Sequence, residues 1–235
     1  MSKPPLKILY EDNHLLVVEK PAGLPTQGVA EGTPSVVTRA KAYLKQKYRK
    51  PGNVYLGVVS RLDAFVSGVL VLARTSKAAT RLTEQFRSST VSKVYQALVE
   101  RPPDPPAGEL THWLLKNDKE RRIEVVPPRT KNAQHARLSY RTLHKHRRGT
   151  LVEIELHTGR KHQIRVQLAE IGCPIVGDRK YGSRQPLADM AIALHAVRLT
   201  IEHPTTRQPL TVESPLPENW NTNPKRQRGN TNPKR

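Results

Sequence analysis

The chain has 235 residues and 36% hydrophobic residues, and its length allows one substantial hydrophobic core in one or at most two domains. It carries 40 Lys and Arg against 20 Asp and Glu, a formal net charge of +20. Such an excess favours a polyanionic partner, most often nucleic acid, over the plainer alternative of a solvated basic surface without a specific partner.

Cysteine, histidine and hydropathy exclude several classes of protein. The single cysteine, Cys173, excludes an intrachain disulfide and a zinc site built from several cysteines. The nine histidines contain no His-Glu-x-x-His pattern, so we predict no bound metal. No apolar run approaches the roughly 20 residues that a membrane-spanning helix needs, and the N-terminus lacks a signal-peptide segment. We therefore expect a soluble, cytoplasmic protein.

The first 74 residues predict strands around one helix. "KILYEDNHLLVVEKPAG" predicts two short strands joined by an Asp-Asn turn, followed by a Pro/Gly loop. "TPSVVTRAKAYLKQKYRK" predicts a helix with Thr33 or Ser35 as its N-cap. Two further strands with a connection between them follow: "NVYLGVV", "SRLDAFV" and "SGVLVLART".

The middle of the chain begins with an amphipathic helix, "SKAATRLTEQFRSS", which Ser76 can cap. "VSKVYQALVE" predicts a strand on which Lys93 and Tyr95 share one face. A Pro-rich break at 101–108 precedes a strand-like, strongly basic region at 112–150. Four of its cations form a possible phosphate-binding surface, with a solvated charged strand as the alternative: Arg141, Lys145, Arg147 and Arg148.

The last third predicts a strand in "LVEIELHTG", a helix in "RKHQIRVQLAEIG" that Gly172 ends, and two closing strands in "ALHAVRLTIEHP" and "PLTVESPLP". Strands and helices are interleaved irregularly, several strands are joined by short turns, and no βαβ rhythm occurs. This order predicts an α+β fold with a mainly antiparallel mixed β-sheet and flanking helices.

The end of the chain has a different composition. "NTNPKR" occurs at 221–226 and again at 230–235. Such polar, cationic repeats cannot form a core, so we predict a single domain at 1–220 and a disordered basic tail at 221–235. The tail either adds loose electrostatic affinity for nucleic acid or is a dispensable solvated segment.

The stretch "VVSRLDAFVSG", residues 58–68, places an ionisable Asp63 between two apolar segments. An Asp between strands is more often a turn residue than a catalytic group. Arg61 before it and Ser67-Gly68 after it favour a functional loop. Tyr95 could likewise be a half-buried strand aromatic, or, with Lys93 on the same face, a platform for a nucleobase.

A second cluster, "HTGRKHQIR" at 157–165, presents Arg160, Lys161, His162 and Arg165 around a predicted helix start. Cations there oppose the helix dipole, which makes a plain basic surface an unusual arrangement. A nearby anion would resolve it: a phosphate, a buried carboxylate or both.

These segments resemble the RluA-type pseudouridine synthase family. "GVVSRLDAFVSGVLVLARTSKAA" resembles the family's catalytic stretch, with Ser60 where the family usually has His and Val66 where it usually has Thr. Four further segments, in order from about residue 8 to 199, match family motifs: "ILYEDNHLLVVEKPAGLPTQG", "SKVYQALV", "HTGRKHQIRVQLAEIGCPIVGDRKYG" and "LHAVRL".

The resemblance implies a pseudouridine synthase-like catalytic fold that isomerises uridine in ribosomal or transfer RNA without a cofactor. It also implies a monomer that begins at the catalytic fold, without the N-terminal RNA-binding domain of many relatives. Neither a Gly-x-x-x-x-Gly-Lys-Ser/Thr nor a Gly-x-Gly-x-x-Gly motif is present, in keeping with the absence of a nucleotide cofactor.

The resemblance also implies roles for individual residues. Asp63 matches the nucleophile, and Arg165 matches the partner that keeps it charged and oriented. Tyr95 matches the residue whose ring packs on the target base and assists proton removal from carbon-5. We assign RNA contacts to four further residues: Arg61, Lys93, Arg160 and His162.

Two other functions compete with catalysis. A non-catalytic RNA-binding or RNA-folding factor on the same fold is possible because Ser60 and Val66 alter the active loop. A basic, ribosome-associated structural protein would explain the charge but not the ordered motifs. The presence of Asp63, Tyr95 and Arg165 favours the enzyme, since a binding protein needs none of the three.

Overall fold

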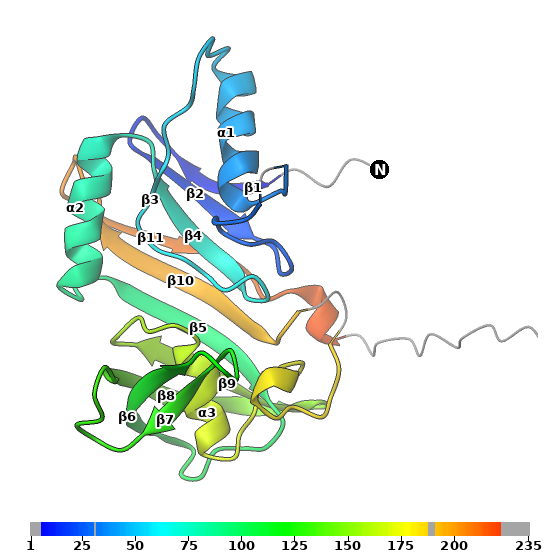
Figure 1. The fold of residues 1–235 in the computed structure, drawn as a ribbon. Helices are drawn as coiled ribbons and strands as arrows, with labels where there is room; N and C mark the ends of the chain where they lie inside the picture. Colours follow the sequence, from blue (N-terminus) through cyan, green and yellow to red (C-terminus); the bar gives the residue numbers. More distant parts are fainter. Residues whose placement is uncertain (1–5, 31, 188–190, 222–235) are drawn as a thin grey trace, which may run out of the picture.

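The computed structural model describes residues 6–30, 32–187 and 191–221, and these build one eleven-stranded sheet (Figure 1). Among its strand pairs, only β4–β10 is parallel, so the predicted α+β fold with a mainly antiparallel sheet is confirmed. Nine strands follow one another across the sheet: β1 (Lys7–Glu11), β2 (Leu15–Lys20), β4 (Ser67–Ala73), β10 (Leu194–Glu202), β5 (Ser92–Val99), β9 (Gly149–Leu156), β8 (Gln134–His146), β6 (Ala107–Asn117) and β7 (Arg122–Val126). Two short strands lie off this path: β3 (Gly57–Val58) pairs with β4, and β11 (Pro209–Glu213) pairs with β10.

The molecule has an upper and a lower half, and each half has its own helices (Figure 1). α1 (Val36–Lys47) and α2 (Ser76–Arg87) lie beside β1 to β4 in the upper half, and α3 (Gln163–Glu170) lies beside β6 to β9 in the lower half. Two 3₁₀ turns complete the described chain: η1 (Arg179–Tyr181) and η2 (Glu218–Asn221). Within it, no helix is long and apolar enough to cross a membrane.

The first four residues of strand β2, LLVV, are apolar because both faces of the sheet are covered there. Leu15 and Val17 pack into the cluster that contains Leu82 of α2, whereas Leu16 and Val18 pack into the cluster with α1. The period-2 alternation of a strand sends neighbouring side chains to opposite faces, so a strand buried on both sides reads as a continuous apolar run.

Some predicted boundaries were wrong. Thr75, not Ser76, caps α2, because Thr75 has the extended backbone that an N-cap needs and its hydroxyl accepts the N–H of Ala78. The strand predicted from "NVYLGVV" shrinks to Gly57–Val58, the two residues that pair with β4. α3 begins only at Gln163, because its N-cap, His162, has a left-handed φ of 55°. The predicted basic tail lies outside the described residues, apart from Asn221.

Candidate active site

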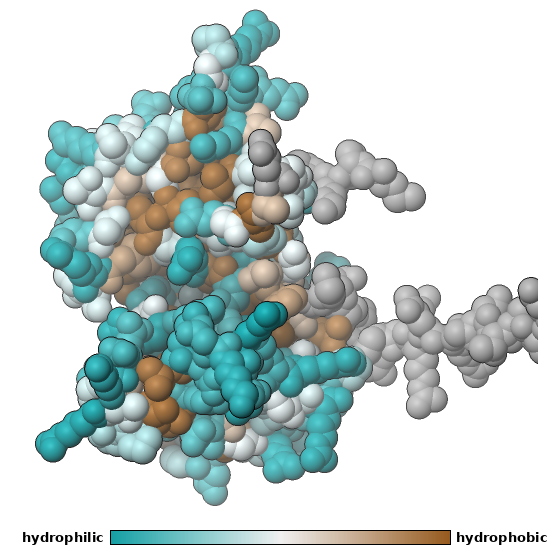
Figure 2. Space-filling view, in the orientation of Figure 1, coloured by the Kyte–Doolittle hydropathy of each residue, from teal (hydrophilic) through white to brown (hydrophobic). Residues whose placement is uncertain are grey.

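A cavity of about 750 Å³ opens between the two halves of the molecule. Figure 2 shows the surface hollowed between them in this view. The loop between β3 and β4, strand β5, and the turn that leads into α3 contribute to its wall. The structure brings all seven candidate site residues into this wall: Arg61, Asp63, Lys93, Tyr95, Arg160, His162 and Arg165.

Residues 20–26, at the end of β2, hold the loop that carries Asp63. The fully buried Lys20 donates hydrogen bonds from Nζ to the carbonyl oxygens of Pro21 (2.9 Å), Leu24 (2.6 Å) and Ala64 (3.0 Å). The hydroxyl of Thr26 donates to the carbonyl oxygen of Leu62 at 2.9 Å and accepts the Leu62 N–H at 3.3 Å. The loop is therefore fixed mainly through its backbone.

The loop departs from the family pattern at two positions, Ser60 and Val66. Val66 is buried in the apolar core, and its N–H donates to the carbonyl oxygen of Asp63 at 3.1 Å, which closes a turn. Ser60 is half-buried in the cavity wall. None of the loop contacts from Lys20 and Thr26 uses either side chain, so both departures are compatible with this loop conformation.

The Gly68 that follows the loop has a structural requirement. Its φ is +117°, and a Cβ atom would lie 2.3 Å from the carbonyl oxygen of Ala196 in β10. Only glycine permits this backbone conformation and so close an approach of β4 to its parallel neighbour. The Ser-Gly pair of the motif thus marks the point where the loop enters the sheet.

The sequence left open which anion faces the basic cluster at 157–165, and in the structure two carboxylates do. Arg165 is 3% exposed and donates from Nη1 to Oδ2 of Asp63 at 3.2 Å. Its Nε and Nη2 donate to the two carboxylate oxygens of Asp178 at 2.6 and 2.8 Å. Burial alone would lower the pKa of Arg165, but Asp178 and then Asp63 raise it overall, so the guanidinium stays charged.

Hydrogen bonds fix the orientation of His162 beside Asp63. The N–H of Ile123 donates to Oη of Tyr181 at 3.0 Å, and the same hydroxyl is hydrogen-bonded to Nδ1 of His162 at 2.8 Å. Nε2 of His162 lies 3.7 Å from Oδ2 of Asp63. Burial lowers the pKa of His162 to about 4, against the opposing effect of Asp63, so the ring is neutral near pH 7.

Tyr95 and Lys93 reach the cavity from the same face of β5, as the strand pattern predicted. Burial raises the pKa of the Tyr95 phenol well above its ordinary value, and the charge of Asp63 raises it further. Tyr95 is therefore a neutral phenol that offers a ring face and a hydrogen-bond donor. Burial lowers the pKa of Lys93.

The cations near the cavity differ in exposure. Arg61 and Arg160 are exposed, and Nε of Arg160 donates to the carbonyl oxygen of His135 at 3.0 Å. None of the four cations of the predicted phosphate surface lies in the cavity wall. Arg148 does not belong to such a surface, because it is 7% exposed and its guanidinium donates to the carbonyl oxygen of Pro186.

Sequence reasoning missed three residues that support the site: Lys20, Asp178 and Tyr181. Each lies in a segment that matches a family motif, and that match was the available signal. Among the residues that the structure describes, no three His, Cys, Asp or Glu side chains gather as metal ligands would.

Lys20→Met gives a testable pH dependence. Burial lowers the pKa of Lys20 from its ordinary 10.5 to about 7, so between pH 7 and 10 the unfolded chain binds more protons at this site than the folded chain. The free energy of unfolding therefore gains a contribution that rises with pH, by about 1.4 kcal/mol per pH unit at most. Urea denaturation at pH 6.5, 8 and 9.5 should show that the wild-type protein gains stability relative to Lys20→Met as the pH rises. A difference that stays constant would contradict this assignment.

Comparisons with known proteins identify the family of this chain. Residues 14–170 match the RNA pseudouridylate synthase family. The chain belongs to this family. Ribosomal large subunit pseudouridine synthase D of Nitrosomonas europaea is 38% identical over 91% of this chain, and the chain spans 63% of that relative's length. The protein of the same name from Pseudomonas aeruginosa is 35% identical over 92% of this chain and 69% of its own length.

A solved structure of another pseudouridylate synthase family member has the same architecture. The human protein titled RNA Pseudouridylate Synthase Domain Containing 4 superposes with a TM-score of 0.75 at 28% identity, over 90% of this chain and 89% of that one. Both the pseudouridine synthase fold and the family resemblance predicted from the motifs are thereby confirmed.

Proposed function

We propose that this chain isomerises uridine in RNA to pseudouridine, with Asp63 as the nucleophile. The observation that carries the proposal is the position of the Asp63 carboxylate. It lies in the wall of a cavity, 27% exposed, and the buried Arg165 holds it from one side. A carboxylate that attacks a substrate must be accessible, and the cation of Arg165 beside it favours the charged form that attack requires.

The reaction exchanges one bond to the ribose for another. The bond between nitrogen-1 of uracil and carbon-1 of the ribose breaks, the base turns, and carbon-5 bonds to the same ribose carbon. Carbon-5 loses its hydrogen to solvent, and nitrogen-1 gains one, so the isomerisation is redox-neutral. Attack of Asp63 on the ribose and attack on the uracil ring are both compatible with the position of the carboxylate.

The other cavity residues suit recognition of a flipped nucleotide. A stacked uridine cannot reach Asp63, so it must leave the helix at a cost of about a few kcal/mol, less in a loop. Arg61 is exposed on the same loop as Asp63. We propose that its side chain fills the space that the uridine vacates in the RNA or contacts the neighbouring RNA backbone. Tyr95 packs its ring against the base, and Lys93 and Arg160 contact phosphates. Since Tyr95 is a neutral phenol, it could take up the carbon-5 proton only after losing its own.

We further propose that the substrate is ribosomal or transfer RNA and that the protein acts as a monomer in the cytoplasm. The names of its relatives favour RNA of the large ribosomal subunit. The net charge of +20 suits a polyanionic substrate of either kind.

Tritium release tests the activity. RNA transcribed with tritium on carbon-5 of uridine, from large-subunit ribosomal RNA and from transfer RNA, is incubated with the wild-type protein. We expect release of about one tritium per modified uridine, and mapping of pseudouridine in the product then identifies the position. RNA binding without release from either substrate class would instead support the RNA-binding or RNA-folding factor.

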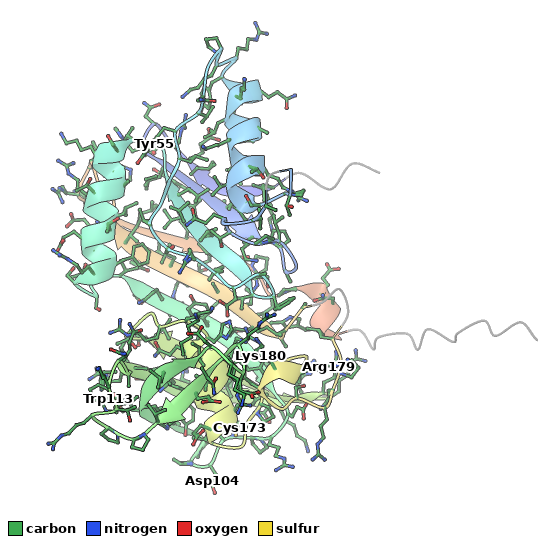
Figure 3. All side chains as sticks on the ribbon, viewed as in Figure 1. Tyr55, Asp104, Trp113, Cys173, Arg179 and Lys180 are labelled. Carbon is green, nitrogen blue, oxygen red and sulfur yellow. The ribbon has the colours of Figure 1, made fainter. Side chains whose placement is uncertain are left out.

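Tyr181→Phe tests whether the orientation of His162 matters for turnover. The change keeps the ring over Arg165 but removes the hydroxyl that is hydrogen-bonded to His162 and accepts the N–H of Ile123. We expect kcat to fall about tenfold with little change in KM, and the imidazole ¹⁵N resonances to show a mixture of tautomers. Tyr55→Phe is the matched control, because Tyr55 is 51% exposed and lies in the upper half of the molecule (Figure 3). Unchanged kcat and ¹⁵N shifts in Tyr181→Phe would contradict the assigned role.

A further inference from the structure

A second hollow, of about 470 Å³, adjoins the active-site cavity. Three residues line both: Ser89, Leu156 and Thr158. The starts of β5 and β8 and the end of β9 supply most of the remaining wall, which includes Thr90, Ser92, His135, Arg137, Glu155 and His157. The two spaces therefore lie side by side and share part of their wall, and the target uridine accounts only for the first of them.

The wall of the second hollow suits a nucleotide. Arg137 and two histidines face one acidic residue, Glu155, and several hydroxyl groups supply donors and acceptors. The exposed Arg137 contacts Glu109 at 3.7 Å, and an ion pair between two half-exposed side chains at this distance contributes little. The guanidinium can turn from it to a phosphate at small cost.

His135 offers a ring for a base. Its ring packs edge-on against Trp113 of β6 with 5.6 Å between the centroids, and Figure 3 shows Trp113 at the outer edge of the lower half. Aromatic and histidine rings held in this way are the usual stacking partners of unpaired bases. The backbone oxygen of His135 also accepts the hydrogen bond from Arg160, so a residue of the active-site cavity and a residue of the second hollow are directly linked.

We propose that the second hollow binds the nucleotide next to the target uridine in the same RNA strand, with its phosphate on Arg137 and its base against His135. The inference rests on the proposed function, because a uridine within an RNA strand has a neighbour on each side. The RNA strand on either side of the target uridine must therefore pass out of the active-site cavity over its rim. The shared wall formed by Leu156 and Thr158 makes the second hollow the adjoining space into which it can pass.

Arg137→Gln is the central test. We expect KM for a short RNA substrate to rise about tenfold, the loss typical of one charge-assisted hydrogen bond, with kcat within about twofold of wild type. Arg122→Gln is the matched control. Arg122 lies on β7, exposed and paired with Glu124, and it lines neither space. An equal rise in KM for both variants would mean that the effect is general electrostatic attraction, and would overturn the proposal.

Shortened substrates locate the contact. RNAs are trimmed from the 5′ or the 3′ side until the target uridine is the terminal nucleotide on that side. If the hollow binds one neighbour, the effect of Arg137→Gln should disappear for one trimmed series and persist for the other, as in a double-mutant cycle. An effect that persists in both series would overturn the proposal.

Direct binding separates this proposal from the proposed function. Fluorescence anisotropy with the same RNAs measures affinity without requiring turnover. Wild-type protein that binds but releases no tritium would refute the proposed function, while the comparison of Arg137→Gln with Arg122→Gln would still decide whether the hollow contacts RNA. The side chain of Arg137 is exposed, and the hydrogen bond from Arg137 to Thr158 comes from the backbone N–H, which glutamine keeps. The variant should therefore fold normally.

Discussion

Asp63→Asn is expected to reduce tritium release at least 1,000-fold, while RNA affinity stays within a few-fold of wild type. The amide has nearly the shape of the carboxylate but is a far weaker nucleophile, and loss of a covalent nucleophile commonly costs 10⁴-fold or more in turnover. The contact with Arg165 weakens, but the pair of hydrogen bonds from Arg165 to Asp178 remains to keep the guanidinium in place. Single-turnover tritium release at saturating RNA, together with anisotropy, checks both parts.

Asp104→Asn is the matched control for this experiment. Asp104 is exposed and lies at the bottom of the lower half, away from the cavity (Figure 3). The same change of Asp to Asn there should leave tritium release unaltered. Equal release from wild type and Asp63→Asn would remove Asp63 from the mechanism, whereas loss of release together with loss of RNA affinity would point to a damaged loop.

The sequence predicted the fold class because fold class depends on local patterns, and the motifs named seven candidate residues that the structure places in one cavity wall. Short apolar runs bounded by turn residues predicted most of the strands, and the Ser-Arg-Leu-Asp and His-Thr-Gly-Arg stretches led to two sides of one cavity. The anion expected near the cations at 157–165 followed from the helix dipole alone, and Asp63 and Asp178 now fill that role around Arg165.

What the sequence could not predict depends on contacts between distant segments. Lys20 and Ala64 are 44 residues apart, and their hydrogen bond is formed only after β2 and β4 have paired. The orientation of His162 similarly depends on Ile123, which the β6–β7 hairpin places next to Tyr181. Arg148 was expected on the surface because a sequence pattern cannot show that the Pro186 carbonyl covers it.

Asp178→Asn is expected to lower both the stability of the protein and its rate of turnover. Asp178 is 1% exposed, and its carboxylate accepts two hydrogen bonds from Arg165. The asparagine amide would point an N–H group at one of the guanidinium N–H groups. The buried positive charge of Arg165 would also lose the negative charge of Asp178. Removal of one partner from a buried ion pair typically costs about 3–5 kcal/mol, which urea denaturation would measure. Glu213→Gln, in the exposed pair with Arg198, should cost less than about 1 kcal/mol.

The rate separates positioning of Arg165 from mere stabilisation of the fold. If Asp178 sets the guanidinium where it meets Asp63, kcat of the folded protein should fall about tenfold or more, because small displacements of reacting groups are costly, while KM changes little. The measurement is made at a temperature where circular dichroism shows the variant to be folded. A folded Asp178→Asn protein with wild-type kcat would mean that Asp178 stabilises the fold without positioning Arg165, and that Arg165 is held over Asp63 by the packing of α3.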